Sequence, residues 1–118
     1  MIRPSADSEI YLYRHAVDMR KAANGLVTIV EGEMNLDPFS SKLFIFCNTA
    51  RTIIKMVGWD GNGFILLVKR IEKARFKWPR NLPLDCVQLN SQQVSWLLDG
   101  YDLTLLQGHS QLPHYTVL

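Results

Sequence analysis

Two β-rich runs joined by a short polar turn constrain the fold of this chain more than any other feature. The runs are RTIIKMVGW (51–59) and GFILLVKRI (63–71), and the residues between them read Asp-Gly-Asn. Aspartate or asparagine beside glycine between two β-rich runs is typical of a tight hairpin turn. We therefore predict an antiparallel pair of strands.

The position of the turn decides the register of this hairpin. A two-residue loop of Gly61 and Asn62, or a four-residue loop over 60–63, sets Trp59 opposite Phe64, whereas a loop of Asp60 and Gly61 sets Val57 opposite Phe64. We prefer the first register because it makes an aromatic cross-strand pair.

Two further strands and a helix are expected before the hairpin. The run KLFIFCN (42–48) is apolar on both faces, which is typical of a central strand, and EIYLYRHAV (9–17) shows strand-like alternation. A helical stripe of apolar residues follows in MRKAANGLVTIVEGEMN (19–35), and Asp18 is a candidate N-cap for it. Pro38 ends this helix, because the residue before a proline disfavours helical geometry.

Two elements are expected after the hairpin. The run ARFKWP (74–79) alternates, with Phe76 and Trp78 on one face, and predicts a further short strand. The run LNSQQVSWLLDG (89–100) carries a helix signature: a capping box, a hydrophobic staple and a glycine stop at Gly100.

These elements predict an α+β domain. We expect a mainly antiparallel sheet of four to five strands with two helices, in the order β-α-β-β-β-(β)-α. At 118 residues the chain fits a single domain over 1–118. Residues 1–8 and 103–118 are expected to be flexible or peripheral arms.

Composition excludes a membrane-spanning chain. The longest apolar runs have five residues, 43–47 and 64–68, and no secretory signal is visible. Cys47 and Cys86 make neither a disulfide framework nor a zinc set, so we expect buried free thiols in the reducing cytoplasm.

Charge is distributed unevenly along the chain. Residues 51–80 hold eight Lys or Arg and two acidic residues, a net charge of +6; because the whole chain carries +2, the remainder carries −4. Such a dipolar chain suits an anionic partner. Two interpretations stay open here: charges that protect an edge strand from aggregation, or a surface that contacts phosphates.

No catalytic constellation is recognised. His109 and His114 have no metal-binding spacing, and Asp18, Asp60 and Glu72 are better explained as a cap, a turn residue and a charge partner. We therefore expect no enzymatic activity, no metal, no cofactor and no small-molecule substrate.

Several motifs, taken together and in order, resemble the TnpB accessory protein of the insertion sequence 66 transposon family, the product of its second reading frame. The motifs are DMRKAANGL, LDPFSSKLFIFCN, KMVGWDGNGFILLVKRIEKARFKWP and LNSQQVSWLLDG, and they cover roughly residues 10–102. The resemblance implies a small protein encoded beside a larger transposase that carries the catalytic triad. It therefore implies a non-catalytic role in transposition and DNA recombination of a mobile element.

Two positions depart from the pattern of this family. Residues 49–52 read Thr-Ala-Arg-Thr, where the family carries several basic residues, and Ala74 stands where it usually carries glycine. The first departure removes charge, so we expect weaker DNA binding than in relatives.

Two hypotheses for the partner follow. In the first, the chain contacts DNA phosphates and assists the transposase and other accessory proteins, through Arg20, Lys21, Arg51, Lys55, Lys69, Arg70, Lys73, Arg75 and Lys77. In the alternative, it is an adaptor that docks on the transposase without touching DNA, through Trp59, Phe64, Phe76 and Trp78.

Overall fold

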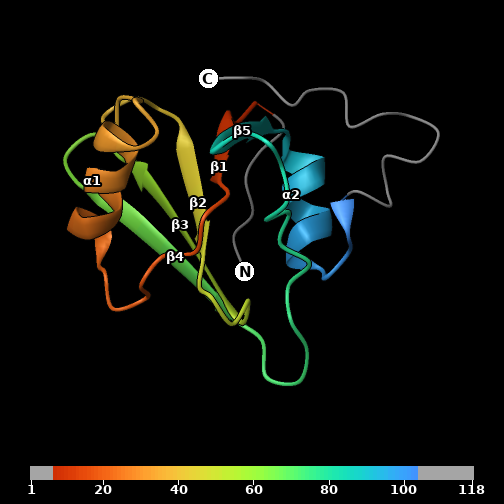
Figure 1. Cartoon of the computed structure of the whole chain (residues 1–118). Coiled ribbons are helices and arrows are strands. Elements are labelled where there is room, and N and C mark those ends of the chain that lie inside the picture. The colour runs from red at the N-terminus through yellow and green to blue at the C-terminus, as the bar shows by residue number, and fades with distance from the viewer. Residues whose placement is uncertain (1–6, 104–118) are drawn as a thin grey trace.

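The computed structural model describes residues 7–103, which form a five-stranded sheet and two helices, an α+β fold in the predicted order (Figure 1). The elements are β1 (Ile10–Tyr13), α1 (Ala23–Gly32), β2 (Leu43–Cys47), β3 (Ile53–Trp59), β4 (Phe64–Arg70), β5 (Cys86–Leu89) and α2 (Ser91–Leu98).

The strands lie in the order β4-β3-β2-β1-β5, so β2 is central, as its apolar sequence predicts. β1 and β2 are parallel and are joined through α1, whereas the other neighbouring strands are antiparallel. A parallel pair needs such a crossover, because a tight turn can join only antiparallel strands.

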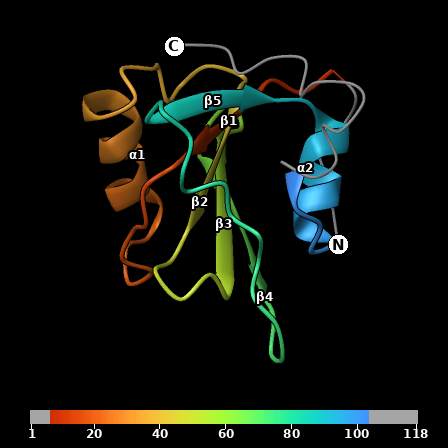
Figure 2. The same ribbon diagram turned by 45° about the vertical axis from the view of Figure 1, so that its right-hand side comes forward.

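One helix lies on each face of the sheet (Figures 1 and 2), and the strands other than the edge strand β4 are buried on both faces. Alternation along β1 explains this arrangement: Ile10 and Leu12 pack in the cluster that includes α2, while Tyr11 and Tyr13 pack in the cluster that includes α1. The longer apolar strand β2 contributes to both clusters in the same way.

The hairpin has the preferred register, with Trp59 opposite Phe64. The amide of Asp60 donates to the carbonyl of Gly63 at 2.7 Å, and Gly61 has a φ of +66°. Glycine takes this left-handed conformation without steric cost, which explains its position in the turn.

Helix α2 has the predicted signals at both ends, although it is shorter than the predicted run. The side chain of Asn90 accepts from the amide of Gln93, and the side chain of Gln93 accepts from the amide of Asn90, both at 2.8 Å. At the other end Gly100 has a φ of +95°, and the amides of Gly100 and Tyr101 donate to the carbonyls of Leu97 and Trp96. These two bonds satisfy carbonyls that the helix itself leaves unpaired.

The prediction that Asp18 caps the first helix is wrong. α1 begins at Ala23, its N-cap is Ala22, and no side chain caps it. Asp18 instead accepts from the amide of Arg20 at 2.9 Å, a local bond that competes with helix formation.

The predicted strand at 74–79 is also wrong, and the fifth strand is β5 instead. The alternation itself is present, since Phe76 and Trp78 are buried and Arg75 and Lys77 are exposed. The segment does not join a strand ladder; its amide at Phe76 donates to the carbonyl of Arg51 at 2.7 Å.

Residues 1–6 and 104–118, which include most of both predicted arms and both His109 and His114, lie outside the described residues. Leu103, the first residue of the second predicted arm, is buried in the core beside α2. Within 7–103, no helix is long and apolar enough to cross a membrane.

Candidate nucleic-acid interface

One end of the sheet gathers the loops that carry most of the basic residues. Since β1 and β2 are parallel and the other pairs antiparallel, the carboxyl ends of β1, β2 and β4 share this end with the amino ends of β3 and β5. The loops there are 14–22, 48–52 and 71–85. Residues far apart in sequence therefore meet there.

The chain that follows β4 is fixed to this end of the sheet at three points. The amide of Ile71 donates to the carbonyl of Thr52 at 3.0 Å, and the amide of Phe76 to that of Arg51. The indole Nε1 of Trp78 donates to the carbonyl of Arg14 at 3.0 Å. Phe76 is fully buried and Trp78 is 6% exposed, so these aromatics hold the segment against the core.

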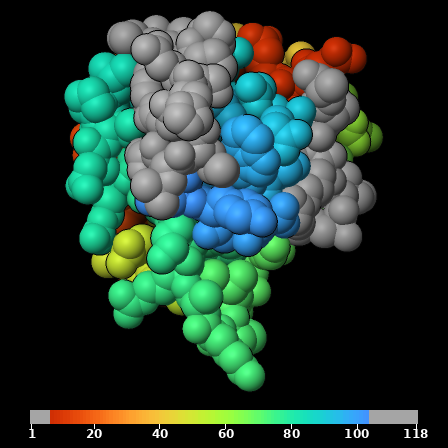
Figure 3. Space-filling model, turned by 90° about the vertical axis from the view of Figure 1, so that its right-hand side faces the viewer, coloured from red at the N-terminus to blue at the C-terminus, as the bar shows by residue number. Residues whose placement is uncertain are grey.

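The cations of this segment point away from the core. Arg70, Lys73, Arg75, Lys77 and Arg80 are all exposed, and we call residues 70–80 the basic segment. In Figure 3 the green residues at the end of β4 and just after it project beyond the rest of the described surface. Within the described part of the chain, the one ion pair recorded for these side chains joins Arg70 to Glu72 at 3.9 Å, a weak, exposed contact.

Two of the nine predicted binding residues donate to backbone carbonyls. The ammonium group of Lys55 donates to the carbonyls of Met19 and Lys21, at 2.7 and 3.0 Å. The ammonium group of Lys69 donates to the carbonyl of Leu98, the last residue of α2, at 2.7 Å. A cation at a helix carboxyl end satisfies a free carbonyl and complements the helix dipole.

The predicted residues before α1 are exposed and differ in their contacts. Arg20 pairs with Asp18 at 2.7 Å, and its hydrogen bonds lower the pKa of that carboxyl to about 2. Lys21 is exposed, and its carbonyl accepts from Lys55.

Arg51 is half-buried in the loop between β2 and β3, and it is unusual in two respects. Its φ is +62°, and its Nε is buried with no hydrogen-bond partner among the described residues. It lies beside the basic segment, because its own carbonyl accepts from Phe76.

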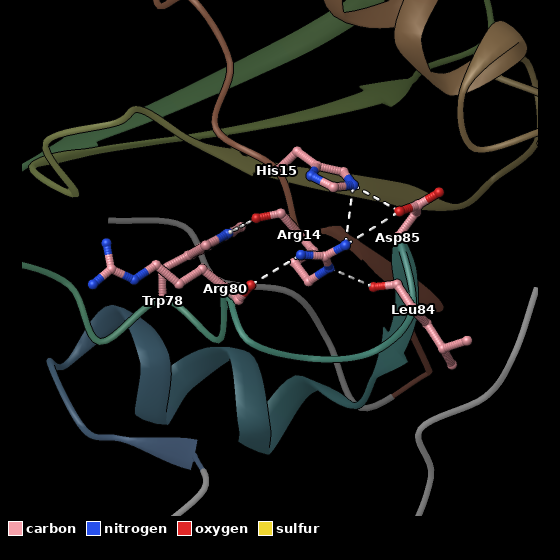
Figure 4. Close-up of polar contacts among 6 residues, drawn as sticks. All are labelled: Arg14, His15, Trp78, Arg80, Leu84 and Asp85. Atoms are coloured by element: carbon pink, nitrogen blue, oxygen red, sulfur yellow. Dashed lines mark hydrogen bonds and ion pairs between the residues drawn. The ribbon is translucent and has the colours of Figure 1, made fainter.

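Residues that the sequence did not single out complete this end (Figure 4). The guanidinium of Arg14 donates to the carbonyls of Leu84 and Arg80, at 2.9 and 3.0 Å, and also contacts Asp85 at 3.4 Å. Nε2 of His15 lies 2.6 Å from Asp85, and this hydrogen bond lowers the pKa of the Asp85 carboxyl. In Figure 4 the guanidinium of Arg80 points away from these contacts. Charge counting over 51–80 did not reach Arg14, His15 or Asp85, because these partners are about 70 positions apart along the chain.

The four aromatics of the alternative hypothesis fall into two pairs. Phe76 and Trp78 belong to the core, whereas Trp59 and Phe64 are half-buried at the hairpin end of β4. Phe39, which is 55% exposed, packs against both, with ring centroids 5.0 and 5.6 Å away. We call Phe39, Trp59 and Phe64 the aromatic cluster.

The candidate carboxylates occupy separate loops. Asp18 binds Arg20, Asp60 lies in the hairpin turn, and Glu72 lies in the basic segment. In residues 7–103 no group of three or more His, Cys, Asp or Glu is arranged to hold a metal ion.

Comparison with known proteins identifies the family. A family model described as "IS66 Orf2 like protein" matches residues 8–108. Uncharacterized protein y4jC of Sinorhizobium fredii (strain NBRC 101917 / NGR234) is 31% identical over 104 residues, which cover 88% of each chain. Uncharacterized protein y4hO of the same strain is 28% identical over 102 residues, 86% of this chain and 88% of its own. No solved structure matches the chain significantly. The chain therefore belongs to the IS66 Orf2-like family, whose members are accessory proteins of transposition.

Proposed function

We propose that this accessory protein contacts DNA phosphates through the basic segment and assists a separate transposase without catalysing strand transfer. One observation carries the proposal: Lys73, Arg75 and Lys77 are exposed, on a backbone fixed by buried aromatics, with no acceptor recorded for them among the described residues. Lys55 and Lys69, in contrast, already bind carbonyls. A protein that orders a row of unpaired cations is suited to a polyanion.

The contacts expected of such a surface position the protein and do not read sequence. Lys and Arg side chains bind phosphate oxygens of any sequence and release condensed counterions, so affinity falls as salt rises. A fixed segment loses less conformational entropy on binding than a disordered one. We therefore expect measurable affinity for unrelated duplex DNA.

Single substitutions within the basic segment test the proposal. Fluorescence anisotropy with a labelled duplex, repeated over a salt series, gives the slope of log affinity against log salt. Lys73→Gln, Arg75→Gln and Lys77→Gln should each reduce the size of the slope by about 0.9, the value for one lost phosphate contact.

Lys42→Gln is the matched control. It removes the same charge from the residue before β2, at the other end of the sheet. The control should keep the wild-type slope, and equal slopes for all four variants would reject the basic segment as the DNA surface.

A second function, docking on the transposase, is supported by the aromatic cluster. Phe64 and Arg70 are the first and last residues of β4, so the cluster and the basic segment begin at opposite ends of that strand. One protein can therefore engage DNA and a protein partner at once. Aromatic side chains that contact one another and remain partly exposed are typical interface anchors.

Phe39→Ser tests this second function, because the exposed ring is outside the core. The variant should weaken binding to the purified transposase of the element while leaving DNA affinity unchanged. Unchanged transposase binding would reject the cluster as an interface.

A further inference from the structure

A hollow of about 290 Å³ lies beside the basic segment, against the loop between β2 and β3. Its lining combines three cations with an indole, a proline ring and one carboxylate. The residues that supply these groups are Arg51, Lys77, Arg80, Trp78, Pro79 and Asp102.

A second hollow of about 190 Å³ adjoins the first. Arg51, Trp78 and Arg80 line both, and the second adds Arg14 and His15. Arg51 and Arg80 therefore border both hollows. The guanidinium of Arg14 already binds two carbonyls and Asp85, whereas the side chains of Arg51 and Arg80 have no hydrogen-bond or ion-pair partner among the described residues.

Arg51 has one property that its local structure does not explain. Its left-handed φ of +62° belongs to the tight turn between β2 and β3, in which its amide donates to the carbonyl of Asn48 at 3.1 Å. Its buried Nε, however, donates to nothing within residues 7–103, and a buried donor without an acceptor is uncommon. The fold therefore buries the Nε of Arg51 without supplying an acceptor for it, which lowers the stability of the protein without bound ligand.

The charges around the first hollow favour an anion. Arg51, Lys77 and Arg80 repel one another, and the lining sets one carboxylate, Asp102, against these three cations. Guanidinium groups match the oxygens of a phosphate with paired hydrogen bonds. We propose that this hollow binds one phosphate group, either a terminal or an internal phosphate of DNA. This deepens the proposed function, and its relevance to DNA rests on that function.

Inorganic phosphate is the direct probe of the hollow. The full chain, labelled with nitrogen-15, is titrated with phosphate and, in parallel, with chloride at equal ionic strength. Phosphate should shift the indole N–H of Trp78 and the amides of Arg51 and Arg80 in a saturable way, and chloride should not. Absence of a saturable shift would overturn the proposal.

Variants distinguish phosphate binding in the hollow from general electrostatic attraction to the basic surface. Arg51→Gly removes the guanidinium at a φ that glycine adopts readily, and should weaken phosphate binding about tenfold or more, the value of one charge-assisted hydrogen bond. Arg80→Gln should weaken it comparably and provides a second test should the first variant misfold. Lys73→Gln, an equal charge loss outside the hollow, should leave phosphate affinity nearly unchanged. An equal loss in Lys73→Gln would overturn the proposal.

Competition with oligonucleotides distinguishes the two sources of phosphate. A 5′-phosphorylated strand should displace inorganic phosphate at lower concentration than its 5′-hydroxyl counterpart where the terminal group is bound, and equally well where internal phosphates are bound. Displacement by neither strand would overturn the assignment to DNA. DNA binding without any phosphate response would reject the hollow alone, whereas a phosphate response without DNA binding would reject the proposed function alone.

Discussion

Replacing Lys55 with methionine should destabilise the fold while leaving DNA binding largely intact. Lys55 lies on the face of β3 that packs toward α1, and its ammonium group holds two carbonyls of the loop before that helix. Methionine keeps most of the aliphatic stem, so the substitution removes mainly the charge and its hydrogen bonds.

The two bonds contribute unequally to the expected loss. The bond to Met19, at 2.7 Å, is partly buried, and the bond to Lys21 is exposed, so water can replace the second. A hydrogen bond from a charged donor contributes about 1.5–3 kcal/mol, and we expect a loss of about 2 kcal/mol, nearly all from the Met19 bond. For a chain of this length that corresponds to a fall in Tm of about 8 °C.

Urea denaturation followed by circular dichroism measures the change, with Lys73→Met as the control. Lys73 is exposed, so its replacement should change the free energy of unfolding by less than about 0.5 kcal/mol. A Lys55→Met protein as stable as the wild type but with strongly reduced DNA affinity would refute the structural role of Lys55.

Three further predictions follow from the burial of the cysteines, the hydrogen bonds of two carboxylates and the backbone conformation of Arg51. Burial raises the pKa of the Cys47 and Cys86 thiols to about 12, so the native protein should resist iodoacetamide at pH 8 while the urea-denatured protein reacts; rapid native alkylation would contradict this burial. Hydrogen bonds from neighbouring side chains lower the pKa of Asp85 and that of Asp18, the latter to about 2, so both carboxylates stabilise the fold above about pH 4. Thermal unfolding should therefore show this stability falling as the pH drops toward 2, and Asp18→Asn should flatten the decline. Arg51→Gly should be more stable than Arg51→Ala by about 1 kcal/mol, because alanine is strained at the left-handed φ of this residue; equal stabilities in urea would refute this.

The elements that the sequence predicts well are specified by residues close together along the chain. The hairpin register follows from a turn of four residues between Trp59 and Phe64, and the ends of α2 follow from Asn90, Gln93 and Gly100. Such signals act within one or two turns of chain, so they are legible without knowledge of the fold.

The failed predictions concern segments held by distant partners. Residues 19–22 carry a helical stripe, but their carbonyls bind Lys55, more than 30 positions away. β5 has four residues and forms only against β1, which precedes it by more than 70 positions. Alternation in 74–79 reports burial correctly, yet it cannot report whether the backbone pairs with a strand.

The candidate site was predicted only in part, because contacts between residues distant in sequence also determine it. Charge counting located the basic segment, because five of its cations lie within eleven residues. Counting could not separate Lys55 and Lys69, whose partners are backbone carbonyls, from Lys73 and Lys77. It could not find the hollow at Arg51 either, since three loops and the segment after α2 supply its lining residues and those of the adjoining hollow.

Mapping of a short duplex on the nitrogen-15 spectrum of the full chain tests the central claim most directly. At low salt the duplex should shift amides in 70–81 and in the loop at 48–52, with fast exchange that weakens as salt rises. The amides around Phe39 and the hairpin turn should not move. Shifts confined to the aromatic cluster, or no shifts at low salt, would contradict the account and leave the protein partner as the remaining function.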